Sequence, residues 1–233
     1  MLDRFFVHGT VDVVDDLTPR TRRIRIVGDA LRGLDWTPGQ HVRVLVGDLR
    51  SAQNWLHGLR DTLRTYSVWD HDPAGRLELC VLDHDGDGPG VRWARAVRVG
   101  HRVAFTRPEG RLVLADRAPY HVFVGDETAA VAFGAMLRAL PGSARVHGIV
   151  EVDGPEDHLP LSRAVVWVHR TAGSSVTDAV RALELPDEPG VAYVAGEARA
   201  CQAVRRHLVR ERGWSRKEVV VKAFWAPGKR GLD

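Results

Sequence analysis

Four consecutive residues near the end of the first third of the sequence carry side chains suited to holding a cofactor. Arg64, Thr65, Tyr66 and Ser67 begin a run of alternating residues that predicts a β-strand. Side chains alternate between the two faces of a strand, so Arg64 and Tyr66 would share one face and Ser67 the other, unless a bulge intervenes. A guanidinium binds phosphate through paired hydrogen bonds, and a phenol can lie flat on another ring. The alternative is an ordinary surface strand.

A glycine-rich segment, 84–90, follows and leads into a predicted helical turn or two over 91–96. Gly86, Gly88 and Gly90 allow a close backbone approach, and a helix N-terminus offers N–H groups to a phosphate. Together the two segments suit a flat redox ring joined to a pyrophosphate, which describes FAD. The alternative is an acidic hairpin loop, because Asp83, Asp85 and Asp87 would repel phosphate unless they point away. The spacing lacks the final glutamate of a calcium-binding EF-hand loop.

Two acidic segments in the second half each follow a predicted strand and open a predicted helix. The first is 125–129, with Asp126, Glu127 and Thr128, and the second is 195–198, with Glu197. Ligands of α/β proteins bind at the carboxyl ends of parallel strands. Helix capping explains the same residues, and both interpretations can hold together.

The last strand-like segment combines aromatic and basic residues. Phe224 and Trp225 could cover one face of a ring, and Lys222 and Lys229 could hold an anionic substrate. The alternative is a core strand followed by a solvated basic tail.

The elements that would position these residues fall into two groups. Short strands with regular turns dominate the first half and predict an antiparallel barrel; 47–63 is interpreted as a long connection. Strands alternate with helices in the second half and predict a parallel sheet covered by helices. The predicted barrel strands are 4–14, 21–28, 41–46, 64–69, 76–83 and 101–107. The predicted sheet strands are 121–125, 146–152, 165–170, 191–195 and 219–224, with helices over 127–140 and 198–212.

Composition favours an ordinary globular protein of 233 residues with 44% hydrophobic and 27% charged residues. Cys80 and Cys201 are its two cysteines, which implies no disulfide framework and a reducing compartment. We find no signal-peptide pattern and no apolar stretch of membrane-spanning length, and expect a cytoplasmic protein.

The net charge of +3 is small and scattered, so nucleic acid is a weaker expectation than a phosphorylated cofactor. H-E-x-x-H, paired C-x-x-C and G-x-S-x-G patterns are absent, and the scattered histidines predict no metal site.

The ordered combination of these segments resembles the siderophore-interacting proteins, flavin-dependent ferric-siderophore reductases of the ferredoxin–NADP reductase superfamily. The resemblance covers essentially the whole chain. It implies an N-terminal FAD-binding β-barrel over 1–116 and a C-terminal parallel-sheet α/β domain that binds NAD(P)H over 117–233. The motifs that carry it are 17–23, 40–43, 64–67, 84–94, 125–129, 195–198, 211–213 and 224–225.

The resemblance also implies roles for individual residues. Arg64 would contact the FAD phosphate, and Tyr66 and Ser67 would meet the isoalloxazine ring. Lys222, with Lys229, would lie near the anionic ferric chelate. The implied cofactor-binding set is Arg64, Thr65, Tyr66, Ser67, His84, Gly88, Pro89, Gly90, Val91, Asp126, Glu127, Thr128 and Trp225, with Arg170 in the nicotinamide-nucleotide crevice.

The chain departs from the family pattern at a few positions. Val91 stands where the family often has a phosphate-binding serine, Trp69 replaces a second arginine, and Phe224 replaces a tyrosine. Arg170, Arg199 and Arg205 are all possible partners for the 2′-phosphate of NADPH, so NADH and NADPH are not separated.

The implied function is electron transfer from NAD(P)H through FAD to a ferric siderophore. Ferrous iron suits hard oxygen ligands less well, so reduction would release the metal. The cofactor would carry the chemistry, which requires no nucleophile from the protein. The alternatives are an FAD-dependent reductase of the same superfamily with another acceptor, and a non-catalytic binder of siderophore or nucleic acid. The oligomeric state is left open.

Overall fold

The computed structural model describes residues 6–47, 62–84 and 86–229. The chain divides into two compact units, Met1–Arg111 and Leu112–Asp233. The sequence-based boundary lies a few residues farther along, near 116–119. Most of the predicted connection 47–63 lies outside the described residues. Among the helices that are described, none is long and apolar enough to cross a membrane.

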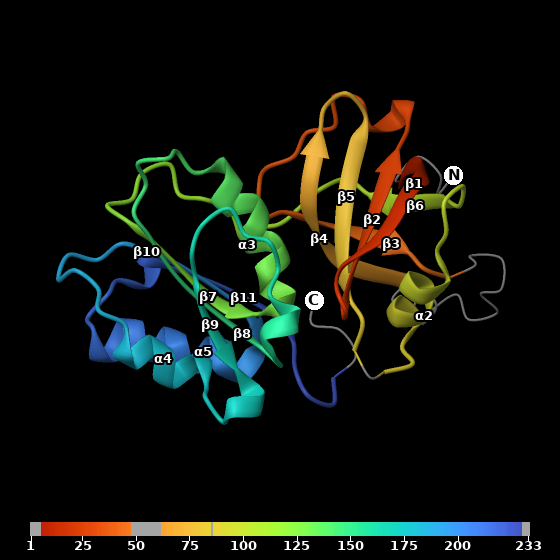
Figure 1. The fold of residues 1–233 in the computed structure, drawn as a ribbon. Helices are drawn as coiled ribbons and strands as arrows, with labels where there is room; N and C mark the ends of the chain where they lie inside the picture. Colours follow the sequence, from red (N-terminus) through yellow and green to blue (C-terminus); the bar gives the residue numbers. More distant parts are fainter. Residues whose placement is uncertain (1–5, 48–61, 85, 230–233) are drawn as a thin grey trace. The chain divides into compact units, whose positions relative to one another are not determined.

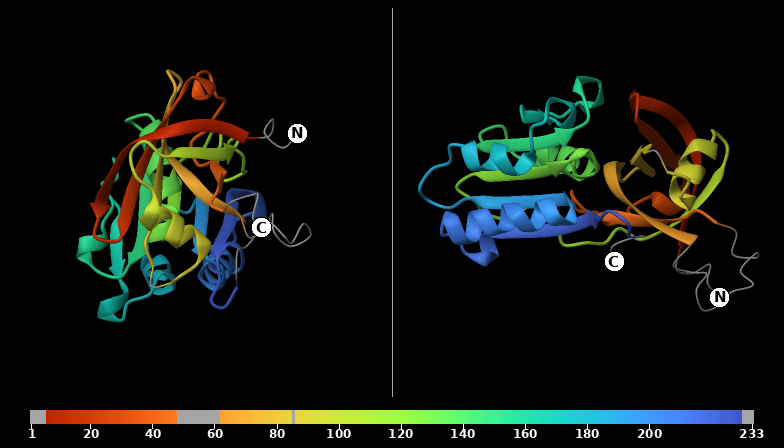
Figure 2. Two further views of the ribbon diagram at one scale, coloured as in Figure 1. Left: turned by 90° about the vertical axis from the view of Figure 1, so that its right-hand side faces the viewer. Right: turned by 90° about the horizontal axis from the view of Figure 1, so that it is seen from below.

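The first unit, hereafter the barrel, is a closed antiparallel β-barrel with the strand order β1-β2-β5-β4-β3-β6 (Figures 1 and 2). Its hydrophobic core is built from the inward-facing residues of all six strands. The helix α2, Pro89–Ala96, adds Ala94 to this core. The strands are β1 Phe6–Thr18, β2 Thr21–Val27, β3 His41–Leu45, β4 Leu63–Asp72, β5 Arg76–Leu82 and β6 Arg102–Thr106.

Alternation along β2 shows why these sequences form barrel strands. Ile24 and Ile26 are fully buried, whereas Arg23 and Arg25 point outward. Arg23 binds the carboxylate of Asp15 on β1 through two hydrogen bonds of 2.9 and 2.5 Å. The predicted strand 4–14 therefore ends too early, because this cross-strand pairing with β2 keeps β1 extended to Thr18.

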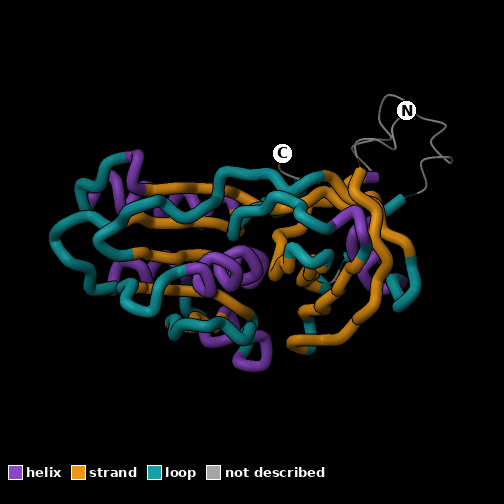
Figure 3. The backbone as a smooth tube through the Cα atoms, turned by 90° about the horizontal axis from the view of Figure 1, so that it is seen from above, coloured by secondary structure: helices purple, strands orange, loops and turns teal. Residues whose placement is uncertain are grey.

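The second unit, hereafter the sheet unit, contains a five-stranded parallel sheet in the order β11-β10-β7-β8-β9. Helix α3 covers one face, and helices α4 and α5 cover the other (Figure 1). Figure 3 shows helices and strands alternating through this unit. Its elements are β7 His121–Asp126, α3 Glu127–Ala139, β8 Val146–Val152, β9 Val166–His169, α4 Val176–Ala182, β10 Val191–Glu197, α5 Ala198–Arg206 and β11 Val219–Trp225.

Two helical features of the sheet unit differ from the sequence-based prediction. Helix α4, Val176–Ala182, was not predicted; it is short and buries only Val176 and Val180 along its length. The predicted helix 198–212 changes to a π-helix over His207–Glu211, where Leu208 and His207 are both buried. The predicted class, an antiparallel barrel followed by a parallel α/β unit, is confirmed.

Candidate functional site

The register between β3 and β4 fixes which way the Arg64–Tyr66 motif faces. Tyr66 lies opposite Val42, and Arg64 lies opposite Val44. Directly opposed residues share a face of the sheet, and both valines are fully buried. Arg64 and Tyr66 therefore point to the inner face of the barrel.

Thr65 and Ser67 occupy the other face of β4. Thr65 lies opposite Arg43 and is exposed, and Ser67 lies opposite His41. The predicted alternation of this motif is confirmed. The β-bulge in β4 comes later, between Val68 and Asp70, so it does not re-aim Ser67.

The hydroxyl of Tyr66 is buried and has no hydrogen-bond partner among the described residues. The phenol ring stacks on Trp93 of α2, with ring centroids 5.5 Å apart and 29° between the planes. Burial raises the pKa of the Tyr66 hydroxyl, so it remains a neutral donor. A buried hydroxyl without a partner is costly, and a ligand that accepts its hydrogen bond would remove that cost.

The N-terminus of α2 meets this tyrosine. Pro89 occupies the first helical turn, Gly88 is the N-cap, and none of the described side chains caps the helix. A β-carbon at Gly90 would lie 2.7 Å from the Tyr66 hydroxyl oxygen and 3.2 Å from Cγ of Arg64. Glycine at this position therefore lets the backbone of the helix approach Tyr66 and Arg64 closely.

Val91, at the position where the family often has a serine, is a buried residue. It can offer a phosphate only its backbone N–H. Residues in the first turn of a helix have N–H groups without intrahelical partners, and these groups attract anions. The start of α2 and Arg64 thus form one region that suits a pyrophosphate.

Two acidic residues of the preceding loop, Asp83 and Asp87, are bound by arginines of α2, and Asp85 lies outside the described residues. Arg95 holds Asp83 through hydrogen bonds of 2.8 and 3.1 Å, and Arg92 reaches the Asp87 carboxylate at 3.3 Å. The hydrogen bond from Arg95 lowers the pKa of Asp83. Arg95 also donates to the His84 carbonyl at 3.2 Å, while the residue His84 is exposed. The two carboxylates are thus paired with guanidinium groups, which weakens the objection that they would repel phosphate.

The groups gathered around Tyr66 fit FAD. The barrel holds an aromatic plane, a guanidinium, a buried hydroxyl and a helix N-terminus. No described side chain binds that hydroxyl or caps that helix. FAD has an aromatic ring system with hydrogen-bonding edges and a pyrophosphate, and each of these groups has a counterpart there.

The second candidate region is the carboxyl edge of the parallel sheet. Strands β7 and β10 are neighbours at the sheet's centre, with β8 and β9 to one side and β11 to the other. The strand order reverses between β7 and β10, and such switch points form ligand crevices in α/β folds. The predicted residues Asp126 and Trp225 end β7 and β11, and Glu127 and Thr128 open α3.

Asp126 organises this edge. Its carboxylate is buried and accepts from the N–H of Thr128 at 2.9 Å, from the N–H of Glu197 at 2.8 Å and from Nε1 of Trp225 at 2.8 Å. A β-carbon at Gly196, where φ is +116°, would collide with this carboxylate. Asp126 therefore joins the ends of β7, β10 and β11.

Glu127 and Arg170 belong to an ion-pair network. Glu127 is only 7% exposed and is bound by both terminal nitrogens of Arg170, one at 3.1 Å. Arg170 also contacts Glu151 at 3.1 Å through Nε and Asp153 through Nη1. Burial raises the pKa of Glu127, and the hydrogen bonds from Arg170 oppose this shift.

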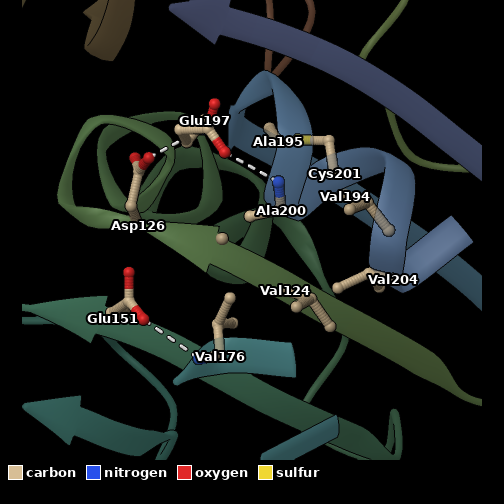
Figure 4. A pocket seen from close by; sticks show the side chains of 11 residues that line it. Val124, Asp126, Glu151, Val176, Val194, Ala195, Glu197, Ala200, Cys201 and Val204 are labelled. Atoms are coloured by element: carbon tan, nitrogen blue, oxygen red, sulfur yellow. Dashed lines mark hydrogen bonds between the residues drawn. The ribbon is translucent and has the colours of Figure 1, made fainter. Parts of the chain in front are cut away.

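Carboxylates also occupy the starts of the helices behind this edge. Glu197 accepts from the N–H of Ala200 at 2.7 Å, and Glu151 accepts from the N–H of Val176 at 3.0 Å (Figure 4). Together with Asp126, these two carboxylates line a cavity of about 10 Å³, roughly the space of one water. The predicted capping role of Asp126 is confirmed, since it caps α3.

The C-terminal residues of the prediction lie on β11 and beyond it. Trp225 is 39% exposed, although its indole N–H is tied to Asp126. Lys222 lies opposite Ala195 in the register and is partly buried. Lys229 is exposed and follows the strand.

Two residues of the carboxyl edge were not predicted. Glu151 and Asp153 come from the end of β8 and the loop after it, and sequence reasoning did not select either one. The rule that identified 125–129 could have found them, because an acidic residue at the end of a predicted buried strand is the same signal.

Two family models match the chain. The model described as "Siderophore-interacting FAD-binding domain" matches residues 10–112, and the one described as "Siderophore-interacting protein" matches residues 118–228. The first match covers the barrel strands and α2, and the second covers the parallel sheet. The barrel therefore corresponds to the FAD-binding domain of that family.

Individual proteins that are similar to this chain in sequence or structure point to the same family. The mycobactin import ATP-binding/permease protein IrtA of Mycobacterium tuberculosis is 28% identical over 95% of this chain, which spans only 26% of that protein. The ferric vibriobactin reductase ViuB of Vibrio cholerae is 28% identical over 72% of this chain and 64% of that protein. A siderophore utilization protein from T. fusca superposes with a TM-score of 0.80 at 27% identity, covering 98% of this chain and 95% of that one.

Proposed function

The chain belongs to the siderophore-interacting protein family, and we propose that it is an FAD-dependent oxidoreductase that uses NAD(P)H to reduce ferric siderophores. In this proposal 1–116 binds FAD and 117–233 binds NAD(P)H. The reaction would take place in the cytoplasm, as the low cysteine content suggests.

The observation that carries the flavin part of the proposal is the buried hydroxyl of Tyr66 beside Gly90, which has no hydrogen-bond partner within 6–47, 62–84 and 86–229. A protein that never binds a ligand there would gain from a phenylalanine. Arg64 would bind the pyrophosphate, helped by the N–H groups of Gly90 and Val91. Ser67 would reach the polar edge of the ring, and Thr65, His84, Gly88 and Pro89 would complete the site.

When bound, FAD supplies the ability to take a hydride from NAD(P)H and to pass electrons singly to Fe(III). The residues of the sheet unit would position the reductant. Thr128 and the backbone around Asp126 would face the nicotinamide nucleotide, and the exposed part of the Trp225 indole would cover a ring. The bond to Asp126 would hold that indole in one orientation.

The acceptor is proposed from two observations. A relative of this chain is named a ferric vibriobactin reductase. All three lysines of the chain, Lys217, Lys222 and Lys229, lie in its last seventeen residues. Lys222 lies within β11, and Lys229 comes after the strand has ended at the carboxyl edge. An anionic ferric chelate could bind these two lysines there.

The first test is the absorption spectrum of the purified protein after incubation with FAD, recorded before and after anaerobic NADH or NADPH. We expect a bound-flavin spectrum that bleaches and then recovers when a ferric siderophore is added, with ferrous iron captured by a chelator. Recovery only with protein acceptors would favour another reductase of the superfamily. Failure to bind FAD would reject the reductase and leave a non-catalytic binder.

A matched pair of lysine variants tests the acceptor site. Lys222→Ala should raise KM for an anionic ferric siderophore about tenfold, as expected for loss of one partly buried charge contact. Lys217 lies before β11, in the short helix Arg216–Glu218 at the amino edge of the sheet. Lys217→Ala should leave KM unchanged, and an equal effect of both variants would contradict the proposed position.

A further inference from the structure

We propose that the carboxyl edge of the parallel sheet is built to take NADH in preference to NADPH. The inference rests on the proposed function, because it concerns the coenzyme that would supply the electrons. The two coenzymes differ only at the 2′-oxygen of the adenosine ribose, which is a hydroxyl in NADH and carries a phosphate in NADPH. The question is therefore which charges and hydrogen-bonding groups would face that oxygen.

In a dinucleotide-binding sheet, the residue that distinguishes the two coenzymes usually lies at the end of the second strand, after the first βα unit. It contacts the 2′-position of the adenosine ribose. An acidic side chain there accepts a hydrogen bond from a 2′-hydroxyl, whereas a nearby arginine accommodates a 2′-phosphate. In this sheet the first strand is β7 and the next, beside it, is β8. Glu151 lies opposite Asp126 in the register, near the end of β8, and Asp153 follows the strand.

Arg170 is the arginine at this place, and its hydrogen-bonding groups are already used. Its Nε contacts Glu151, its Nη1 contacts Glu127 and Asp153, and its Nη2 contacts Glu127. Four of the five N–H groups of a guanidinium therefore point at carboxylates. A phosphate needs a free pair of N–H groups for bidentate binding. The one N–H left over is on Nη2, so Arg170 could offer such a pair only by releasing one of these carboxylates, which would then lose its cationic partner.

The charges around Arg170 also disfavour the 2′-phosphate of NADPH. Glu151 and Asp153 alone outnumber this single cation, and Glu127 adds a third carboxylate to the same group. A dianionic 2′-phosphate would enter beside like charges, whereas a 2′-hydroxyl could donate a hydrogen bond to either outer carboxylate. Like-charge contacts are a common means of rejecting the wrong ligand.

Of the other arginines considered from the sequence, Arg199 lies at the start of α5, between the cavity-lining residues Glu197 and Ala200, whereas Arg205 lies near the far end of that helix. Arg199 and Arg205 are exposed on α5, which packs on β10, β11 and β7. Lys222 is on β11, at one edge of the strand order, whereas the ion-pair network is on β8 and after β9, at the other edge. Arg205 and Lys222 therefore do not offset the acidic charge at the end of β8.

The test measures binding and does not depend on turnover. Calorimetric titration of the FAD-loaded full-length protein with NAD⁺ and NADP⁺ should give a Kd for NADP⁺ at least about tenfold higher, as expected for like-charge contacts. Asp153→Asn and Glu151→Gln each remove one negative charge and keep an oxygen acceptor. Each should tighten NADP⁺ binding about threefold or more while NAD⁺ binding stays equal or weakens.

A matched control is Asp187→Asn, which makes the same charge change at an exposed residue of the loop before β10, at the amino edge of the sheet. It should leave the ratio of the two Kd values unchanged. Equal or tighter binding of NADP⁺ by the unaltered protein, or no response to the Asp153 and Glu151 variants, would overturn the inference and leave the reductase proposal intact. Binding of neither dinucleotide would overturn both.

Discussion

At the scale of single residues, the two candidate regions use polar groups in opposite ways. In the barrel, the Tyr66 hydroxyl is buried and has no partner in the part of the chain that the structure describes. In the sheet unit, the Asp126 carboxylate accepts hydrogen bonds from three different segments. An unpaired buried group is suited to receiving a ligand, and a fully paired one is suited to positioning its neighbours.

Tyr66→Phe should separate ligand binding from stability. We expect the FAD-free protein to become more stable by about 1 kcal/mol, because a buried hydroxyl without a partner is removed. The Kd for FAD should rise about tenfold, because the cofactor loses a hydrogen bond. Urea denaturation and fluorescence titration with FAD measure the two effects.

Tyr193→Phe provides the contrasting control. The Tyr193 hydroxyl accepts a hydrogen bond from the N–H of Ala115 at 2.9 Å, so its removal should destabilise the protein by about 1 kcal/mol. Loss of stability in Tyr66→Phe, equal to that of this control, would mean that the Tyr66 hydroxyl is already satisfied in the free protein.

Asp126→Asn should disturb the whole carboxyl edge. An amide has one oxygen where the carboxylate has two, so the N–H groups of Glu197 and Thr128 and the indole of Trp225 cannot all keep a partner. We expect a loss of about 2–4 kcal/mol in the stability of the sheet unit. Trp225 fluorescence should shift as its ring becomes mobile, and an unchanged spectrum would contradict the positioning role.

At the scale of elements, the sheet unit buries imidazole rings as well as carboxylates. The rings of His121 and Tyr193 stack with centroids 6.0 Å apart on the face covered by α3. Burial lowers the pKa of His121, and it likewise lowers the pKa of His147 and His158. Nε2 of His158 also lies 2.8 Å from Nε2 of His169, and this neighbouring ring adds to the lowering of the His158 pKa.

These histidines predict how stability depends on pH. Their pKa values in the folded protein lie below the ordinary value of 6.5, so the unfolded chain binds protons first as the pH falls. The contribution of these neutral histidines to the free energy of unfolding should be fully present above about pH 7. It should be lost as the pH falls through 6.5 toward their lower pKa values in the folded protein. Urea midpoints between pH 5 and 7.5 measure this decline.

His121→Phe removes one of the titrating groups and keeps an aromatic ring in the stack. The variant should show a shallower decline over the same pH range. Asp15 of the barrel affects stability only at lower pH, because the hydrogen bond from Arg23 lowers its pKa below the ordinary value of 3.8. A slope unchanged in His121→Phe would show that this residue does not titrate differently on unfolding.

At the scale of the whole molecule, the chain is two compact units with separate cores. The barrel carries the groups that fit FAD, and the sheet unit carries the carboxyl edge that we propose binds a nicotinamide nucleotide. Each function can therefore be followed in its own part of the chain.

FAD should stabilise the two units unequally. At about 100 times its Kd, the ligand should add about 2.7 kcal/mol to the stability of the unit that binds it. Hydrogen-exchange mass spectrometry should show the largest gain in protection over β3, β4 and α2, with a smaller gain over β7 and β8. Equal protection of both units would contradict the assignment of FAD to the barrel.

The sequence alone determined the order and type of the main elements. Period-two alternation located the barrel strands because each strand has one wet and one buried face, as Arg23 and Ile24 illustrate. The end-of-strand rule located Asp126 because its position depends only on a local change from strand to helix. The motif 64–67 was recognised by residue type, and its alternation followed from strand geometry.

Only the tertiary structure decided which distant residues meet. It places Gly90 against Tyr66, and it surrounds Arg170 with Glu127, Glu151 and Asp153. Strand order and register create these contacts between segments far apart in the chain, and no local periodicity encodes them. Arg170 was therefore a possible phosphate ligand in the sequence and is an arginine bound by carboxylates in the fold.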